Sequence, residues 1–378
     1  MSTLGTLGVW VVPFLFGLTI VVFFHELGHF LVARWCGVRV LVFSIGFGPE
    51  LFGFNDRYGT RWKVSAVPLG GYVKFFGDDS AASTPDQSAL QSMNETERRL
   101  SFFHQPVSRR AAIVAAGPLA NFILAIVIFA GVLMTLGRPV MTPRVDAVQP
   151  GSAAAEAGLQ PGDLVLAIDG RRVADFVDMQ RIVSGSAGRT LTITVNRGGA
   201  PVDLKATPRQ GKGGFCNGGL LGISRSNAGE TLSNQTVGPI AALGMGVDET
   251  HLIIDRTLCY IGNVFIGRES ADQLGGPGRI AQVLGEGWKG TFDHAGFFAA
   301  LGDLLQKTAF LSVSIGLLNL FPIPLLDGGH LLFYLIEAVR GRPLSERAQE
   351  MGFRFGLVVV VMLMIFATFN DILHWTRT

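Results

Sequence analysis

Four long apolar runs, separated by polar segments, organise the chain. They cover residues 1–33, 111–136, 308–336 and 355–369. A bilayer core of ~30 Å is crossed by about 20 helical residues, so runs of this kind predict transmembrane helices. The fold class expected is therefore a polytopic α-helical membrane protein with four transmembrane helices. An N-terminal signal peptide is the alternative for the first run, but a basic start is missing and ionisable residues lie within the run.

The basic residues of the short connections predict the orientation. Arginines follow the first run, precede the second and separate the third from the fourth, and such residues mark cytoplasmic loops. They are Arg34, Arg39, Arg98, Arg99, Arg109, Arg110, Arg340, Arg342, Arg347 and Arg354. Both termini and the long stretch after Arg138 are then expected on the outer side of the membrane.

The segments between the runs predict further elements. Two β-prone stretches flank a Pro-Leu-Gly-Gly turn within 61–77 and predict a β-hairpin. Residues 78–110 are polar and predict a cytoplasmic loop, whereas 236–306 read as an amphipathic segment on the membrane surface. Within 138–235, the alternating LTITV at 191–195 predicts a strand of an external α+β domain. We therefore divide the chain into 1–137, 138–235, 236–306 and 307–378.

Composition agrees with a membrane protein. Hydrophobic residues make up 48% of the 378 residues, charged ones only 16%, and the net charge is +2. Cys36, Cys216 and Cys259 are odd in number and not spaced as metal ligands, so we expect neither a disulfide framework nor a thiolate site. The lipid bilayer is an expected partner, and nucleic acid is not.

The first apolar run contains His25-Glu26-Leu27-Gly28-His29, an H-E-x-x-H pattern. Residues four apart share a helical face, so both imidazoles can reach one metal ion, with Glu26 beside it as acid/base. Chance or a polar helix surface could also give this pattern. Ionisable groups inside a span are costly, however, and usually functional.

Asp327, in NLFPIPLLDGGH at 319–330, is the candidate third ligand. It is the one carboxylate in the third run before Glu337. Asp also favours turns and helix caps, and the neighbouring prolines and glycines favour a break in the helix, so a turn or cap is the other interpretation of this residue. If helical, His25 and Asp327 lie roughly 14 and 20 Å from the arginines that end their runs. Both are therefore expected in the cytoplasmic half of the bilayer. His104 and His330 are better read as surface or supporting residues.

With these motifs the sequence resembles the site-2 protease family of intramembrane zinc metalloproteases, closest to the regulator-of-sigma-E protease branch. The matching pieces are HELGH (25–29), FSIGFGP (43–49), PLGGYVKFFG (68–77), AAGPLANF (115–122), NLFPIPLLDGGH (319–330) and GSAAAEAGLQPGDLVLAIDG (151–170), which resembles a PDZ domain.

The resemblance implies Zn²⁺ held by His25, His29 and Asp327, with Glu26 as catalytic acid/base. It implies that Asn319 helps to bind the substrate. The hairpin, including Gly70, Gly71, Tyr72 and Val73, would be membrane-reentrant and add a strand to the substrate. Substrates would be transmembrane segments of single-pass proteins such as anti-sigma factors or remnant signal peptides.

Two alternatives stay open at this point. The chain could be a membrane metal-binding or transport protein that uses the same ligands, or a PDZ scaffold with a vestigial site. A transporter needs no general base, so the presence of Glu26 favours hydrolysis.

Overall fold

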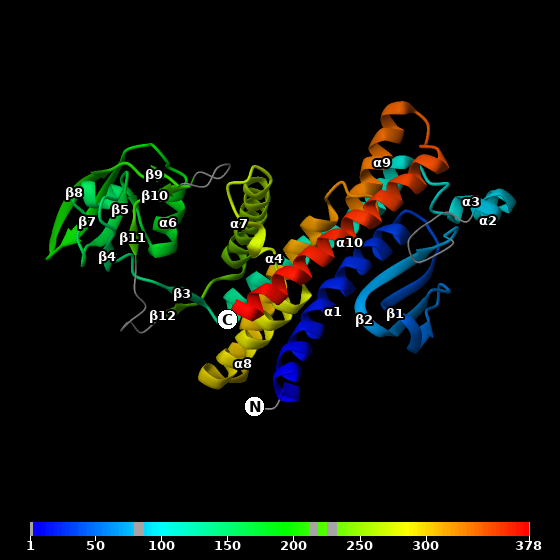
Figure 1. The fold of residues 1–378 in the computed structure, drawn as a ribbon, viewed down its shortest axis with the longest axis horizontal. Coiled ribbons are helices and arrows are strands. Elements are labelled where there is room, and N and C mark those ends of the chain that lie inside the picture. Colours follow the sequence, from blue (N-terminus) through cyan, green and yellow to red (C-terminus); the bar gives the residue numbers. More distant parts are fainter. Residues whose placement is uncertain (1–2, 79–86, 212–217, 225–232, 378) are drawn as a thin grey trace. The chain divides into compact units, whose positions relative to one another are not determined.

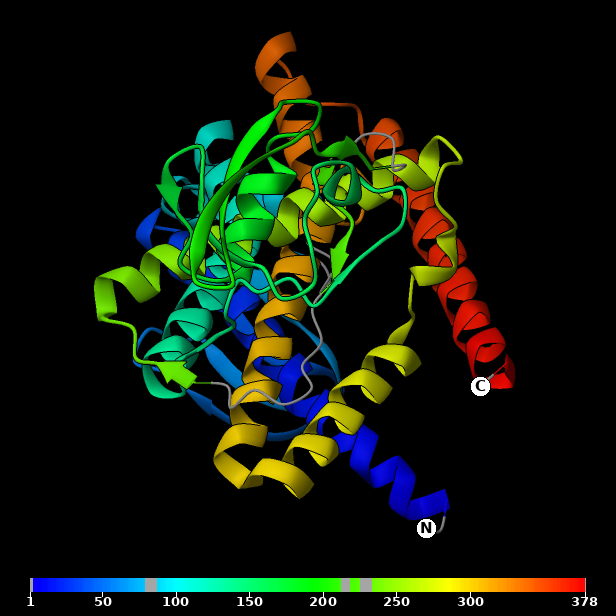
Figure 2. The ribbon, with the colours of Figure 1, turned by 90° about the vertical axis from the view of Figure 1, so that its left-hand side faces the viewer.

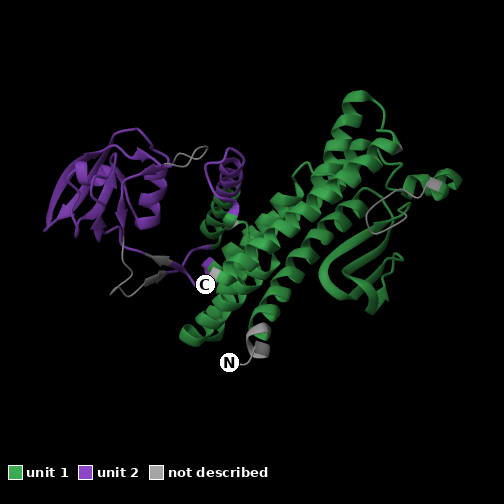
Figure 3. Cartoon of the chain, in the orientation of Figure 1, with its two compact units in different colours: residues 1–132, 239–254, 272–378 green, residues 133–238, 255–271 purple. Residues whose placement is uncertain are grey.

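The computed structural model describes residues 3–78, 87–211, 218–224 and 233–377, and the chain forms two compact units (Figures 1 and 3). Unit 1 combines residues 1–132, 239–254 and 272–378, and unit 2 combines 133–238 and 255–271. Unit 1 contains the long apolar helices, whereas unit 2 contains most of the short strands.

The helices of unit 1 confirm the predicted fold class. They are α1 (Thr3–Trp35), α2 (Gln87–Ser92), α3 (Glu95–Leu100), α4 (Val107–Thr135), α8 (Pro277–Asn319), α9 (Asp327–Arg340) and α10 (Glu346–Arg377), and the first part of α7 (Pro239–Phe265) joins them. Among the described residues, four helices are long and apolar enough to cross a membrane: Gly8–Trp35, Val107–Thr135, Pro277–Asn319 and Arg347–Thr376.

The third apolar run is not one continuous helix. Helix α8 ends at Asn319 and α9 begins at Asp327, so a non-helical segment divides the run. Pro322 and Pro324 cannot donate helical hydrogen bonds, and Leu325 has a φ of 101°, which no right-handed helix contains. The break places Asp327 in the first turn of a new helix whose N-cap is Leu326, so Asp327 follows a helix break but does not cap the helix.

Helix α8 itself changes direction at Gly296, where φ is 80° and ψ is −176° (Figure 2). The rings of Trp288 and Phe297, on either side of this position, meet edge to face at 5.9 Å. Asp371 of α10 fixes the start of the helix, because its carboxylate oxygens accept hydrogen bonds from the backbone amides of Gly276 and Arg279 at 2.8 and 3.1 Å. The placement of 236–306 at a membrane surface stays a prediction.

The β-hairpin of unit 1 is formed by β1 (Val40–Asn55) and β2 (Arg61–Phe75), so both stretches of the predicted 61–77 hairpin belong to β2. They do not pair with each other. Phe43 instead has Val73 as one register partner and Trp62 as another. The first segment of β1 therefore lies between the two stretches, which brings residues 70–73 beside α1.

The described part of the predicted cytoplasmic loop at 78–110 contains the short helices α2 and α3. Asn94 and Glu97 form a capping box at the start of α3, with reciprocal hydrogen bonds of 2.9 Å. The N-x-x-E spacing of these two residues is the signal in the sequence for such a cap. The first residues of the loop, 79–86, lie outside the described residues.

Unit 2 has a four-stranded antiparallel sheet in the order β6-β5-β7-β8, and LTITV is part of β7 as predicted. Leu191, Ile193 and Val195 of β7 are buried in its core. The elements are β3 (Arg138–Val140), β4 (Ala147–Val148), α5 (Ala153–Glu156), β5 (Leu164–Ile168), β6 (Arg171–Arg172), α6 (Phe176–Ser184), β7 (Leu191–Arg197), β8 (Ala200–Ala206), β9 (Arg209–Gln210), β10 (Gly219–Leu220), β11 (Ile223–Ser224) and β12 (Ser233–Gln235).

The cysteines differ from the expectation of unpaired residues. Cys259 is disulfide-bonded, so the expectation was wrong for this residue. Cys36, at the end of α1, is a free thiol. Cys216 lies outside the described residues. Sequence spacing could not reveal the disulfide, because pairing depends on which segments the fold brings together.

Candidate metal and active site

Every residue that the sequence predicts for the site lines one cavity of about 590 Å³ in unit 1. The cavity is bordered by α1, β2, α9 and the C-terminal end of α8. The predicted residues on its wall are His25, Glu26, His29, Gly70, Gly71, Tyr72, Val73, Asn319 and Asp327. Residues from three distant parts of the chain therefore meet, as the motif reading requires.

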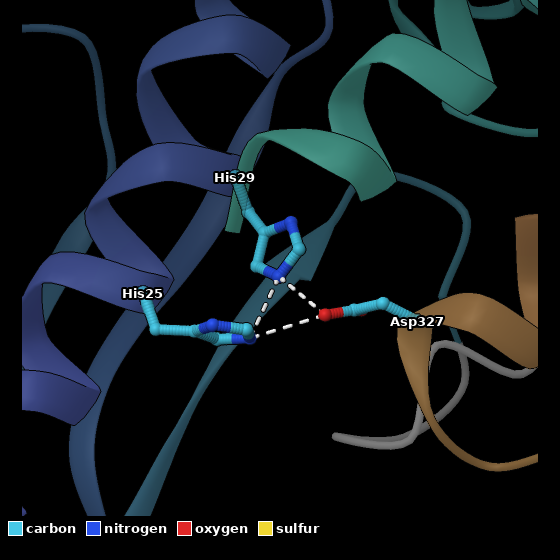
Figure 4. Close-up of side chains that lie close together, drawn as sticks. All are labelled: His25, His29 and Asp327. Atoms are coloured by element: carbon cyan, nitrogen blue, oxygen red, sulfur yellow. Dashed lines mark hydrogen bonds and ion pairs between the residues drawn. The ribbon is translucent and has the colours of Figure 1, made fainter. Parts of the chain in front are cut away.

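The two imidazoles and the Asp327 carboxylate converge at one point (Figure 4). Asp327 Oδ2 lies 3.2 Å from His25 Nε2 and 3.6 Å from His29 Nε2, and the two Nε2 atoms are 3.3 Å apart. Both histidines are 8% exposed. Three potential ligand atoms are thus brought together by mostly buried side chains.

The environment of His29 fixes which of its nitrogens can bind a metal. Its Nδ1 lies 2.9 Å from the backbone carbonyl oxygen of Ile113 in α4. A carbonyl only accepts, so Nδ1 carries the proton and donates, and the lone pair of the neutral ring is on Nε2. That nitrogen is the one directed at Asp327.

The donor set fits a zinc ion. Two imidazole nitrogens and one carboxylate oxygen are the ligands of many catalytic zinc sites. Asp327 Oδ2 is buried and has no hydrogen-bond partner among the described residues, although two histidine nitrogens surround it. A buried carboxylate oxygen is costly unless it is paired, and a metal ion between these three atoms would remove that cost.

Glu26 lies on the same wall of the cavity, next to strand β2. The Val73 backbone amide interacts with its carboxylate, and a Cβ added at Gly71 would come within 3.0 Å of Glu26 Cγ. Glycine at position 71 therefore allows the strand to approach the carboxylate closely. The side chain is only partly buried, so it can contact a molecule inside the cavity.

Several residues that hold α9 in place were missed from the sequence. Arg110 of α4 forms an ion pair of 2.6 Å with Glu337 of α9, and its guanidinium lies 4.8 Å from the ring centre of Tyr334. Both charged side chains are mostly buried, so removal of either one would leave the other as an uncompensated buried charge. Because α9 also carries Asp327, this contact ties the third ligand to α4. No local pattern connects residues so far apart in sequence.

Comparison with known proteins agrees with the site. The sequence model of peptidase family M50 matches residues 13–363. A protein of Rhizobium meliloti named "Putative zinc metalloprotease" is 49% identical over 367 residues, covering 96% of each chain. Metalloprotease MmpA of Caulobacter vibrioides is 41% identical over 382 residues, covering 96% of this chain and 95% of its own.

The chain belongs to peptidase family M50. It is a zinc metalloprotease of the site-2 protease family and a multi-pass membrane protein. The predictions of an enzyme and of a zinc cofactor are thereby confirmed. The branch within the family and the PDZ nature of unit 2 stay predictions.

Gly117 of α4 offers a direct test of the packing around the ligands. A Cβ added at this position would lie 2.3 Å from His29 Nε2 and 2.9 Å from His25 Cε1. We therefore expect Gly117→Ala to displace both rings and to lower zinc binding and proteolysis by at least about 10-fold. Gly131→Ala is the matched control on the same helix, because its Cβ would meet nothing within 4 Å. Equal zinc binding by both variants would contradict the geometry.

Asp78, at the end of β2, predicts a pH dependence of stability. Burial raises the pKa of its carboxyl to about 7, although the Phe75 amide, at 2.7 Å, and the nearby charge of Lys74 favour the ionised form. The folded state thus holds the proton more tightly than an unfolded chain, whose Asp pKa is ~3.9. This contribution to stability is complete below the unfolded value and is lost as pH rises through about 7.

We expect the melting temperature of the wild type to fall by a few °C, as an order of magnitude, between about pH 5 and 8. Asp78→Asn should remove that part of the change, since an amide does not ionise. Asp203→Asn, at an exposed strand residue, serves as the control. Melting curves in detergent at both pH values measure the effect, and parallel curves for wild type and Asp78→Asn would refute it.

Proposed function

We propose that this M50 protease is an intramembrane endopeptidase that cuts transmembrane segments of single-pass membrane proteins. One observation carries the proposal: His25 and His29 lie within Gly8–Trp35, a helix long and apolar enough to cross a membrane. A cavity built around this helix supports peptide-bond hydrolysis at membrane depth, where irregular backbone is tolerated only if it lines a polar cavity.

In this proposal His25, His29 and Asp327 hold zinc, which when bound supplies Lewis acidity toward the scissile carbonyl and a water molecule. Glu26 takes a proton from the attacking water and passes it to the leaving amine. Its position beside the ligands, on the cavity wall, supports this role. Asn319, where α8 ends, would donate to the substrate backbone from the same wall.

The strand Gly70, Gly71, Tyr72 and Val73 would hold the substrate in an extended form. Peptide hydrolysis requires an unwound segment, and a strand edge can bind one through main-chain hydrogen bonds. The position of these residues on the cavity wall supports the role. The external unit would then bind peptide ends as a PDZ domain or exclude substrates with bulky external domains.

We place the protein in a bacterial inner membrane with both termini outside and the site in the cytoplasmic half. The arginine distribution supports this orientation. The disulfide at Cys259 supports it as well, because disulfides persist on the oxidising side of a membrane. Membership of the regulator-of-sigma-E protease branch would make anti-sigma factors and remnant signal peptides the substrates.

The test uses the full chain, purified in detergent, with a panel of single-pass transmembrane helices and a soluble unfolded protein. We expect cleavage of some helices at bonds inside the apolar segment, mapped by mass spectrometry, and loss of cleavage with a zinc chelator. Cleavage restricted to soluble protein or to sites outside the apolar segments would overturn the intramembrane assignment.

A further inference from the structure

Asn121, in α4, is a fully buried amide beside one of the two imidazoles. Its Nδ2 lies 3.2 Å from His25 Nδ1, and its Oδ1 is buried without a hydrogen-bond partner among the described residues. Its backbone carbonyl accepts a hydrogen bond of 2.8 Å from the Ser312 hydroxyl of α8. The main chain of Asn121 is thus hydrogen-bonded to α8, whereas its side chain contacts His25.

The two ends of the amide place different demands on the imidazole. With Nδ2 toward the ring, the amide donates, Nδ1 of His25 accepts, and the proton of the neutral ring is on Nε2, 3.2 Å from Asp327 Oδ2. With Oδ1 toward the ring, Nδ1 must carry the proton and Nε2 presents a lone pair. Only the second arrangement allows Nε2 to bind a metal.

His25 differs in this respect from His29. The partner of His29 Nδ1 is the Ile113 carbonyl, which can only accept, so the metal-binding form of that ring is permanent. The partner of His25 Nδ1 can donate or accept after half a turn of the amide about its Cβ–Cγ bond. The tautomers of His25 and His29, which both lie on α1, are therefore set by different kinds of hydrogen-bond partner.

We propose that Asn121 is a positioning residue that sets the tautomer of His25. Its amide accepts from Nδ1 when zinc binds and donates to Nδ1 when the ring proton is on Nε2. The inference rests on the proposed metal role of His25. Metal loading at this site is accompanied by a half-turn of one buried amide and the transfer of the ring proton from Nε2 to Nδ1.

Three variants test the inference through zinc affinity, measured by competition with a chelator rather than by activity. Asn121→Leu removes both amide ends and should lower the affinity about 10- to 100-fold, the usual effect of losing a partner of a metal-bound histidine. Asn121→Asp can only accept when ionised, so it should hold Nδ1–H and keep the affinity at or above that of the wild type. Ser312→Ala removes only the hydrogen bond to the Asn121 backbone and should leave the zinc affinity unchanged.

Nitrogen-15 spectra of histidine-labelled wild-type protein provide a measurement that needs no variant. The proton of His25 should reside on Nε2 without zinc and on Nδ1 with zinc, whereas that of His29 should stay on Nδ1. An unchanged His25 signal, or an Asn121→Leu affinity equal to the wild type, would overturn the inference. Failure of the wild type to bind zinc at this site would instead overturn the proposed metal role.

Discussion

Replacement of Glu26 by glutamine should abolish proteolysis without removing zinc. The amide keeps the size of the side chain but cannot take a proton from water, and general base catalysis contributes about 10²- to 10⁴-fold. Because the two imidazoles and Asp327 supply the donor atoms, zinc content should stay at the wild-type level. Cleavage of a single-pass helix and metal analysis of the same preparation measure both quantities.

The control is Glu286→Gln, which changes a glutamate of α8 that accepts a hydrogen bond from Gln282 outside the cavity. It should retain full activity. Unimpaired proteolysis by Glu26→Gln would refute the catalytic role of Glu26. Loss of zinc from that variant would show that Glu26 acts on the metal site instead.

Replacement of Asp327 by asparagine should have the largest effect on the metal. The side chain contributes the negative charge of the ligand set, and its Oδ2 faces both Nε2 atoms. We expect zinc affinity to fall by more than the ~10- to 100-fold loss typical of an outer partner, and proteolysis to fall with it. Chelator competition and a cleavage assay at saturating zinc separate these effects.

Asp303→Asn is the matched control, because this carboxylate forms an ion pair with Lys307 in α8 and is not on the cavity wall. Zinc affinity should be unchanged there. If Asp327→Asn binds zinc as the wild type does, the third ligand must be another residue. His330, which also lines the cavity, would be the next candidate.

The number of spans and the chemistry of the site could be predicted because they depend on local patterns, whereas the third long apolar helix covers Pro277–Asn319 instead of the predicted 308–336. Long apolar runs indicate helices that cross a membrane. The four-residue spacing of His25 and His29 places both rings on one helical face. Asp327 could be found because a carboxylate in an apolar run is rare and costly. For each of these features the information lies within about one helix length of sequence.

Features that depend on contacts between distant segments could not be predicted. The ion pair between Arg110 and Glu337 joins two segments that no periodicity connects. The reversal at Gly296 is equally invisible, since glycine is tolerated in helices and only the local backbone angles show the turn.

The sequence by itself therefore determined which atoms could bind zinc: two imidazoles on one helix and a carboxylate on another. The tertiary structure decided how those atoms are presented. The Ile113 carbonyl fixes the His29 ring, the Asn121 amide contacts His25, and Gly117 leaves room for both. Ligand type follows from residue chemistry, but orientation and tautomer follow from hydrogen-bond partners that only folding brings within reach.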